Sequence, residues 1–229
     1  LLLNFTIISC SNNSKFEENN NLNLVDMGNY YLYQNDIELN KQNISDMQFV
    51  DELLGKSSEK KNINGVPAPR RSISKKNSSW PNNEMLFFID ESNGEFTEYE
   101  RDNIYTAMAK LEGYAGIKFI EKNQAGDYIY RIEKTTDPDI CGNSTIGYNS
   151  WARYRFKCTS IGVIQHEILH GLGYWHEQAR PDRDEYITIN TQNIKDGREG
   201  NFDPQTFFDI HGVYYDYDSI MHYGSWAFT

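Results

Sequence analysis

Cysteines, clusters of basic residues and long apolar runs are all scarce in this chain of 229 residues. It has only 3 Cys, and its 22 Lys and Arg are outnumbered by 33 Asp and Glu, which gives a formal net charge of −11 at pH 7. No block rich in Lys and Arg stands out, which argues against a nucleic-acid binder. No apolar run reaches the roughly 20 residues of a membrane-spanning helix. The mean hydropathy of −0.70 also argues against an integral membrane protein.

Aromatic residues are plentiful. They make up 14% of the chain, with 16 Tyr among them, and 24% of the residues are charged. A fully disordered chain is excluded, because such chains lack aromatic residues. The length allows one domain of ordinary size, with its own core, plus an extension.

The first ten residues read as the remnant of a secretion signal. Leu1 to Ile8 are nearly all apolar but too few to span a bilayer, and they end at Ser9-Cys10. Ile7-Ile8-Ser9-Cys10 resembles the lipobox of bacterial lipoproteins, which predicts lipid attachment to the Cys10 thiol. An Asn-rich tract follows, as a tether would. The alternative is that this segment forms a buried first strand.

Residues 11–71 are expected to lie outside the folded domain. They are rich in Asn, Ser, Lys and Glu, and only Met47 to Leu54 suggests a short helix. The stretch from Asn62 to Ser79 contains Gly, two Pro and the dibasic pair Arg70-Arg71, and is therefore an exposed linker open to proteolysis.

From Trp80 onward the pattern predicts alternating strands and helices. Thr97 followed by Glu100 is a capping box that opens a helix, and Gly113 suits its C-terminal end. Alternating strands and helices indicate a mixed α/β layer. After Arg180 the chain is expected to be loop-rich, with turns at Pro181-Asp182 and Asp196-Gly197. Strands are expected at residues 85–89, 117–120 and 128–132, a short edge strand at 144–148, and a second helix at about 160–172.

The motif HEILHGLGYWHE, residues 166–177, carries the chemistry. His166 and His170 are four residues apart, so an α-helix places both on one face, where they can reach a single ion. Neutral imidazole suits zinc, and the His-Glu-x-x-His pattern is a known zinc signature. Glu167 points about 100° away and can flank the ion, close enough to a water molecule to act as a general base.

A third ligand is available six residues later, in His176. A continuous helix would carry His176 to the wrong side. Gly173 tolerates a left-handed backbone, so the helix can end there and the chain can turn back. Three His ligands leave an open position, which is typical of a catalytic zinc site. The alternative is a core helix with hydrogen-bonded histidines, but three of only five His fall within these eleven residues.

The cysteine count is consistent with export. If Cys10 carries a lipid, Cys141 and Cys158 remain as one even pair, which an oxidising compartment would join. The alternative is two reduced thiols in a cytosolic protein. A zinc-activated water with Glu167 as general base predicts peptide-bond hydrolysis without a covalent enzyme intermediate.

The extended motif resembles the metzincin metalloproteases, and in particular the astacin family. Glu177 follows the third His directly, and the run QARPDRDEYI continues to Ile187 as in astacins. SIMHYGSWAF, residues 219–228, resembles the family's Met-turn, and CGNSTIG resembles its edge strand. The resemblance implies a Cys141–Cys158 disulfide. It also implies the metzincin-like zincin fold of class α+β, with a mixed α/β upper lobe, a twisted sheet, a zinc helix and an irregular lower lobe.

The resemblance also implies roles for single residues. Tyr223 would be a switchable fifth zinc ligand that stabilises the oxyanion, although a core Tyr is the alternative. Met221 would form a hydrophobic floor beneath the zinc. Together with His166, His170 and His176 this makes a site for one Zn²⁺ per chain, in a catalytic domain expected at residues 72–229.

Two further family features concern activation. Astacins are made as zymogens whose prosegment Asp blocks the zinc in an F-x-G-D-like motif. Tyr33-Gln34-Asn35-Asp36 is the nearest match here, so Asp36 is the candidate switch, with an ordinary surface Asp as the alternative. Maturation in the family creates an N-terminus that docks near the Glu after the third His, here Glu177, after cleavage near Arg70 or Arg71.

The chain departs from the family pattern at two points. No Cys before Cys141, except Cys10, is available for the family's other disulfide, and the sequence stops at Thr229 shortly after the Met-turn. A catalytic domain incomplete at its C-terminus is therefore expected.

Together these observations predict a monomeric zinc metalloendopeptidase zymogen, secreted or lipid-anchored to the cell envelope. It would act on protein or peptide substrates that pair with the edge strand at 144–148, and would bind no nucleic acid. The alternative is an inactive zinc-binding interaction module with a degenerate or truncated protease fold.

Overall fold

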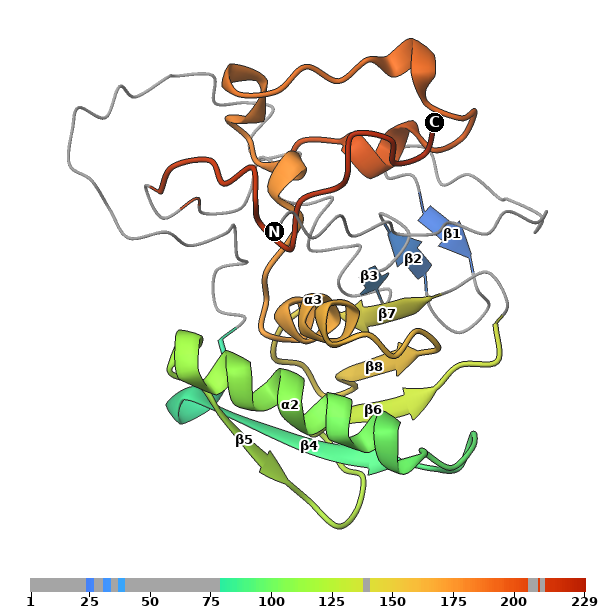
Figure 1. The fold of residues 1–229 in the computed structure, drawn as a ribbon, viewed down its shortest axis with the longest axis vertical. Helices are drawn as coiled ribbons and strands as arrows, with labels where there is room; N and C mark the ends of the chain where they lie inside the picture. Colours follow the sequence, from blue (N-terminus) through green and yellow to red (C-terminus); the bar gives the residue numbers. More distant parts are fainter. Residues whose placement is uncertain are drawn as a thin grey trace. The chain divides into compact units, whose positions relative to one another are not determined.

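The structure is a computed structural model, shown as a ribbon in Figure 1. It describes the backbone of residues 24–26, 31–33 and 37–39, and residues 79–137, 141–205, 210 and 213–229. The described residues fall into two compact units, which are taken separately below. The first holds the described residues of Asn35–Glu38 and Asn77–Tyr174, and the second those of Phe16–Gln34, Leu39–Lys76 and Trp175–Thr229.

The described part of the first unit is built on a mixed sheet with the strand order β3-β7-β8-β6-β4-β5. β5, β4, β6 and β8 run parallel to one another, whereas β7 is antiparallel to β8. The strand bounds are Ile37–Leu39 for β3, Glu84–Asp90 for β4, Lys118–Glu121 for β5, Tyr130–Lys134 for β6, Gly142–Thr145 for β7 and Arg153–Phe156 for β8.

Two helices, α2 and α3, cover one face of this sheet (Figure 1). Burial alternates along β4, which is the pattern of a strand with one face in a core. The apolar stripe of α2 and two isoleucines of α3 complete a single cluster with the inward side chains of the sheet. Its members include Met85, Phe87, Ile89, Ile104, Met108, Leu111, Ile132, Phe156, Ile164 and Ile168. The mixed α/β interpretation, and with it the α+β fold class, is confirmed.

Helix α2 spans Glu98–Ala115 and begins as predicted. The Thr97 hydroxyl accepts from the Glu100 amide, and the Glu100 carboxylate accepts from the Thr97 amide, so the capping box is formed. The predicted end at Gly113 is wrong. The helix continues through Gly113 and ends at Gly116, whose φ of 64° is the left-handed conformation of a helix C-terminus.

Two strands also lie elsewhere than predicted. β6 begins at Tyr130 rather than at Tyr128, because Tyr128 has a φ of 60° and cannot extend a strand. β7 spans Gly142–Thr145 rather than 144–148, since Gly147, with a φ of 66°, turns the chain. β7 is also not an edge strand, because β3 pairs with it in parallel, with Ile37 opposite Ser144.

Helix α3 spans Ile161–Gly171 and carries the zinc motif. Ser160 caps its first turn by accepting from the Val163 amide. At the other end the Gly173 amide donates to the His170 carbonyl at 2.8 Å, and the Tyr174 amide donates to the Leu169 carbonyl at 2.9 Å. This is the Schellman pattern, with Gly173 at φ 101°. The predicted turn at Gly173 is therefore confirmed.

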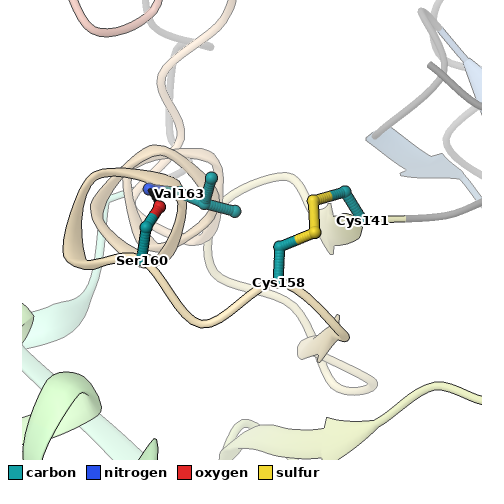
Figure 2. The surroundings of a disulfide bond; sticks show 4 residues. All are labelled: Cys141, Cys158, Ser160 and Val163. Atoms are coloured by element: carbon teal, nitrogen blue, oxygen red, sulfur yellow. Dashed lines mark hydrogen bonds between the residues drawn. A yellow bond between two sulfur atoms is a disulfide. The ribbon is translucent and has the colours of Figure 1, made fainter. Parts of the chain in front are cut away.

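A disulfide joins Cys141 to Cys158, with their Cα atoms 5.0 Å apart (Figure 2). The amides of Lys157 and Cys158 both donate to the Cys141 carbonyl at 2.9 Å. The bridge therefore ties the start of β7 to the segment that leads into the N-cap of α3, at Ser160. The pairing implied by the family resemblance is confirmed.

The described part of the second unit is loop-rich, as expected after Arg180. β1, Leu24–Asp26, and β2, Tyr31–Tyr33, pair antiparallel. From Trp175 onward the described residues contain only short 3-10 helices, at Glu177–Ala179, Arg183–Glu185, Thr191–Asn193 and Glu199–Phe202. None of the helices in the described ranges has the length and apolar character required to cross a membrane.

Candidate metal centre

His166 and His170 present their imidazoles on one face of α3. Their Nε2 atoms are 3.1 Å apart, and the ring planes are perpendicular. The His170 Nδ1 lies 2.7 Å from the Tyr174 carbonyl oxygen. A carbonyl only accepts, so Nδ1 carries the hydrogen and Nε2 keeps its lone pair. The helix C-terminal turn thus fixes the tautomer that a metal requires.

His176 completes the donor set. One ligand nitrogen from each of His166, His170 and His176 lies within 4.8 Å of the others, and all three side chains are buried. Zinc–nitrogen bonds of about 2.0–2.1 Å in a tetrahedral site place ligand nitrogens a little over 3 Å apart, close to the separation on α3. The three residues therefore form a zinc-binding triad, as predicted, and their donor type and spacing fit zinc.

Glu167 follows the first histidine and is buried, with 3% of its surface exposed. Its side chain lies against the backbone of β7 at Gly142. A Cβ added to Gly142 would come within 3.1 Å of the Glu167 Oε1 and 3.2 Å of its Cγ. Glycine at this position therefore lets the carboxylate lie flat against the strand, next to the motif's first histidine.

Met221 and Tyr223 are both buried. The Tyr223 ring lies beside the His176 ring, with centroids 4.5 Å apart. The Tyr223 amide donates to the Gln178 Oε1 at 3.0 Å, and the Glu177 amide donates to the Met221 carbonyl at 2.9 Å. The Met-turn is thus bonded through the backbone to the residues that follow the third histidine.

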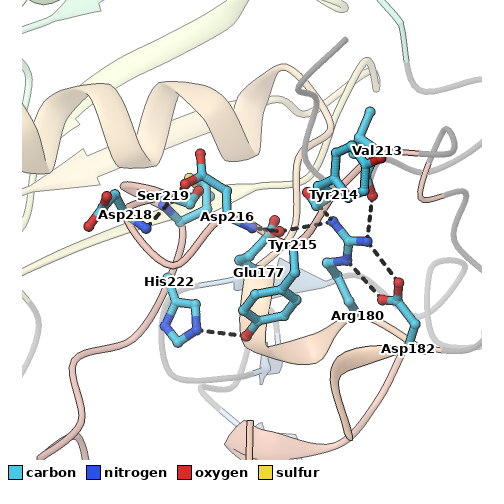
Figure 3. A network of polar contacts seen from close by, with 11 residues as sticks. Glu177, Arg180, Asp182, Val213, Tyr214, Tyr215, Asp216, Asp218, Ser219 and His222 are labelled. Carbon is cyan, nitrogen blue, oxygen red and sulfur yellow. Dashed lines mark hydrogen bonds and ion pairs between the residues drawn. The ribbon is translucent and has the colours of Figure 1, made fainter. Parts of the chain in front are cut away.

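Glu177 lies within a buried polar network (Figure 3). Its Oε1 accepts from the Arg180 guanidinium at 3.0 Å and from the Asp216 amide at 2.9 Å. Arg180 is fully buried and also donates to Asp182 and to the backbone carbonyls of Val213 and Tyr214. Burial raises the pKa of Glu177, while the Asp216 amide and Arg180 act in the opposite direction.

Arg180 is the residue that the sequence interpretation missed. The spacing of three residues between Glu177 and Arg180 could have indicated it, because residues three apart in a helical turn are neighbours and can form an ion pair. Its partners Val213 and Tyr214 are more than thirty residues away in the sequence, which no local pattern predicts. Asp36, Cys10, Arg70, Arg71 and the helix expected at 47–54 lie outside the described residues.

Comparisons with known proteins agree with this geometry. The model of the astacin peptidase family matches residues 72–229. The zinc metalloproteinase dpy-31 of Caenorhabditis elegans is 38% identical over 143 residues, which are 59% of this chain and 24% of that protein. Human Tolloid-like protein 1 is 33% identical over 174 residues, which are 70% of this chain and 16% of that protein.

A solved structure is similar as well. The high choriolytic enzyme 1, a hatching enzyme zinc-protease from the medaka Oryzias latipes, superimposes with a TM-score of 0.57 at 30% identity. The match covers 69% of this chain and 80% of the medaka enzyme. The chain spans about a quarter of dpy-31 and about a sixth of Tolloid-like protein 1. With a family match over residues 72–229 and the metal-binding triad inside that range, the chain belongs to the astacin family.

Proposed function

We propose that this protein is a zinc-dependent metalloendopeptidase that hydrolyses peptide bonds in proteins or peptides. The observation that carries the proposal is the convergence of three buried imidazoles next to a buried carboxylate on the same helix. Membership of a family of zinc proteases supports it.

Each site residue has a role in this reaction. When bound, zinc supplies Lewis acidity, which acidifies water and polarises a carbonyl oxygen. Glu167 accepts the proton of the attacking water and then passes it to the leaving amine, so the carboxylate ends unchanged. Its burial against Gly142 keeps bulk water away from this carboxylate.

Tyr223 is proposed to act on the oxygen of the scissile carbonyl. Its ring lies against His176, and its amide is held by Gln178. A phenol O–H directed at that oxygen stabilises the negative charge that develops there in the transition state. Met221 contributes a buried apolar side chain to the same turn.

The chain is proposed to be a zymogen, with Asp36 as the switch residue. The strand that follows Asp36 directly, β3, pairs with β7 at Ile37–Ser144 and Glu38–Thr145. An extended prosegment on β7 occupies the backbone groups that a substrate strand would use. Removal of the prosegment then frees β7 for an extended peptide.

Glu177 is proposed to receive the mature N-terminus after cleavage near Arg70 or Arg71. Its Oε1 has two donors, whereas its Oε2 is buried and has no hydrogen-bond donor among the described residues. Buried carboxylate oxygens need a donor, and an α-ammonium group supplies one. Mass spectrometry of the processed protein identifies the cleavage site, and cleavage far from this dibasic pair would contradict the proposal.

An extracytoplasmic location is proposed from the Cys141–Cys158 disulfide, because such bonds persist in oxidising compartments. Lipid attachment at Cys10 is proposed from the sequence alone. Metabolic labelling with a radioactive fatty acid tests it, and a Cys10→Ser variant that is labelled equally would exclude this site.

Glu167→Gln is the direct test of the activity. The amide keeps the shape of the side chain but cannot take a proton, so we expect hydrolysis of casein by the chain trimmed near Arg71 to fall by about 10²–10⁴-fold with zinc content unchanged. Zinc is measured by atomic absorption on the same samples. Full proteolytic activity of this variant would remove Glu167 from the mechanism.

The rival function is a zinc-binding interaction module without activity. Casein hydrolysis before and after trimming near Arg71 separates the two. We expect activity to appear on trimming. A trimmed protein that binds zinc but leaves casein intact would favour the interaction module.

A further inference from the structure

We propose that Tyr130, on β6, is a positioning residue for the zinc helix. It fixes the height of α3 above the sheet, and so fixes where the Glu167 carboxylate lies. The kinetic part of this inference rests on the proposed peptidase function, whereas its structural part does not.

The Tyr130 hydroxyl connects the zinc helix to β7. It lies 3.1 Å from the backbone oxygen of Glu167 and 2.6 Å from the Ser144 Oγ. A phenol has one hydrogen, so when it is donated to the Glu167 carbonyl the 2.6 Å contact needs the Ser144 hydroxyl as donor, for which the Thr145 carbonyl at 3.0 Å is a second acceptor. The Tyr130 side chain is fully buried, so water does not compete for either hydrogen bond.

The Tyr130 ring also fills a space that only glycine leaves on α3. A Cβ added to Gly171 would lie 2.6 Å from two ring carbons of Tyr130 and 2.8 Å from its hydroxyl oxygen. No side chain fits there, so ring and helix are in direct contact one turn after Glu167. On the other side Trp80 donates from its indole N–H to the Gly171 carbonyl at 2.7 Å.

A second glycine, on β7, restricts the position of the Glu167 side chain. Gly142, on β7, lies directly against the Glu167 side chain, with 3.1 Å between the Oε1 and the site of an added Cβ. Tyr130 hydrogen-bonds the backbone oxygen of Glu167, and Gly142 packs against the carboxylate of the same residue. Because α3 touches β6 and β7 at these two glycines, a small shift of the helix changes the position of both the base and the two histidines.

Tyr130→Phe and Ser144→Ala test the hydroxyl bonds and leave the ring in place. We expect each variant to lower kcat on casein-derived peptides on the order of tenfold with KM unchanged, as for residues that orient a catalytic group. The double variant should be no slower than Tyr130→Phe, because that change already removes the contact to Ser144 together with the bond to Glu167. Tyr105→Phe is the matched control, because its hydroxyl bonds Glu121 at 3.0 Å, away from α3.

Two readouts do not require peptidase activity. Hydrogen exchange of the metal-free trimmed chain and of the full chain should show faster exchange for α3 amides in Tyr130→Phe and Ser144→Ala than in Tyr105→Phe. The visible absorption of the cobalt-substituted protein should change in the first two variants and not in the control. These readouts decide the inference even if the wild type hydrolyses nothing, a result that would remove only the proposed function.

The inference is overturned if Tyr130→Phe matches the wild type in α3 exchange. It is overturned equally if the effects of the two single variants on exchange or on kcat simply multiply in the double variant. If Tyr130→Phe does not fold, Ser144→Ala decides the inference. That substitution is small and leaves the Tyr130 ring in place against Gly171.

Discussion

Single atoms decide what the metal centre can do. The His170 ring can serve as a ligand because its Nδ1–H donates a hydrogen bond to the Tyr174 carbonyl, which leaves the Nε2 lone pair for a metal. That carbonyl is in place because Gly173 adopts a φ of 101° that other residues rarely adopt. The chemistry of one imidazole therefore depends on a glycine three residues away.

Tyr223→Phe tests the proposed role of the phenol. The ring, and with it the contact to His176, is kept, while the O–H is lost. We expect kcat to fall by about 10²–10³-fold with KM unchanged, because the lost bond forms only in the transition state. Tyr214→Phe, at a residue 68% exposed, is the control and should behave as wild type. A Tyr223→Phe variant with normal kcat would make this residue a core tyrosine.

Glu133, on β6, predicts a pH dependence of stability. Burial raises its pKa above the usual 4.5, although Arg153, Arg131 and Arg155 lower it. Between pH 4.5 and the raised value, the folded state holds a proton that the unfolded state has lost, so stability falls as pH rises. The Glu133→Gln variant has no carboxyl group to titrate here, so its stability does not fall with pH for this reason.

Urea unfolding of wild type and Glu133→Gln from pH 4 to 7 measures the effect. The free energy of unfolding of the variant, relative to wild type, should rise with pH from about pH 4.5 upward. A difference that stays constant or falls over this range would contradict the raised pKa.

At the scale of elements, both ends of α3 were predictable, whereas the end of α2 was not. Ser160 and Gly173 are sharp local signals, and the structure uses both. Helix α2 offered two glycines, Gly113 and Gly116, and local chemistry does not distinguish them. The residues that follow Leu111, up to Gly116, are exposed, so their packing does not explain why the helix passes Gly113 and ends at Gly116.

The two glycines give an opposed pair of substitutions. No atom lies within 4 Å of a Cβ added to either. Gly113→Ala, inside the helix, should raise the free energy of unfolding by about 0.5–1 kcal/mol through helix propensity. Gly116→Ala should lower it by about 1–2 kcal/mol, because its φ of 64° is strained for alanine. Thermal unfolding checks both, and equal effects of the two changes would contradict the observed helix end.

At the scale of the molecule, the sequence predicted the metal ligands and the disulfide but not the long-range pairing. The ligands share one short motif whose geometry follows from the helix repeat. The parallel pairing of β3 with β7 joins residues about a hundred positions apart, and the Glu177 network depends on Asp216. Such contacts follow from the packing of distant segments, on which local sequence patterns carry no information.

The coordination of zinc in the purified protein tests the three-histidine site. X-ray absorption at the zinc edge, together with the metal content, should give one zinc per chain and three imidazole nitrogens at about 2.0–2.1 Å. His176→Ala should lower the imidazole count by one. His222→Ala should leave it unchanged, because the His222 Nε2 lies 2.6 Å from the Tyr215 hydroxyl and is not part of the triad. A protein that binds no zinc at neutral pH, or whose imidazole count is the same in His176→Ala, would contradict the three-histidine site.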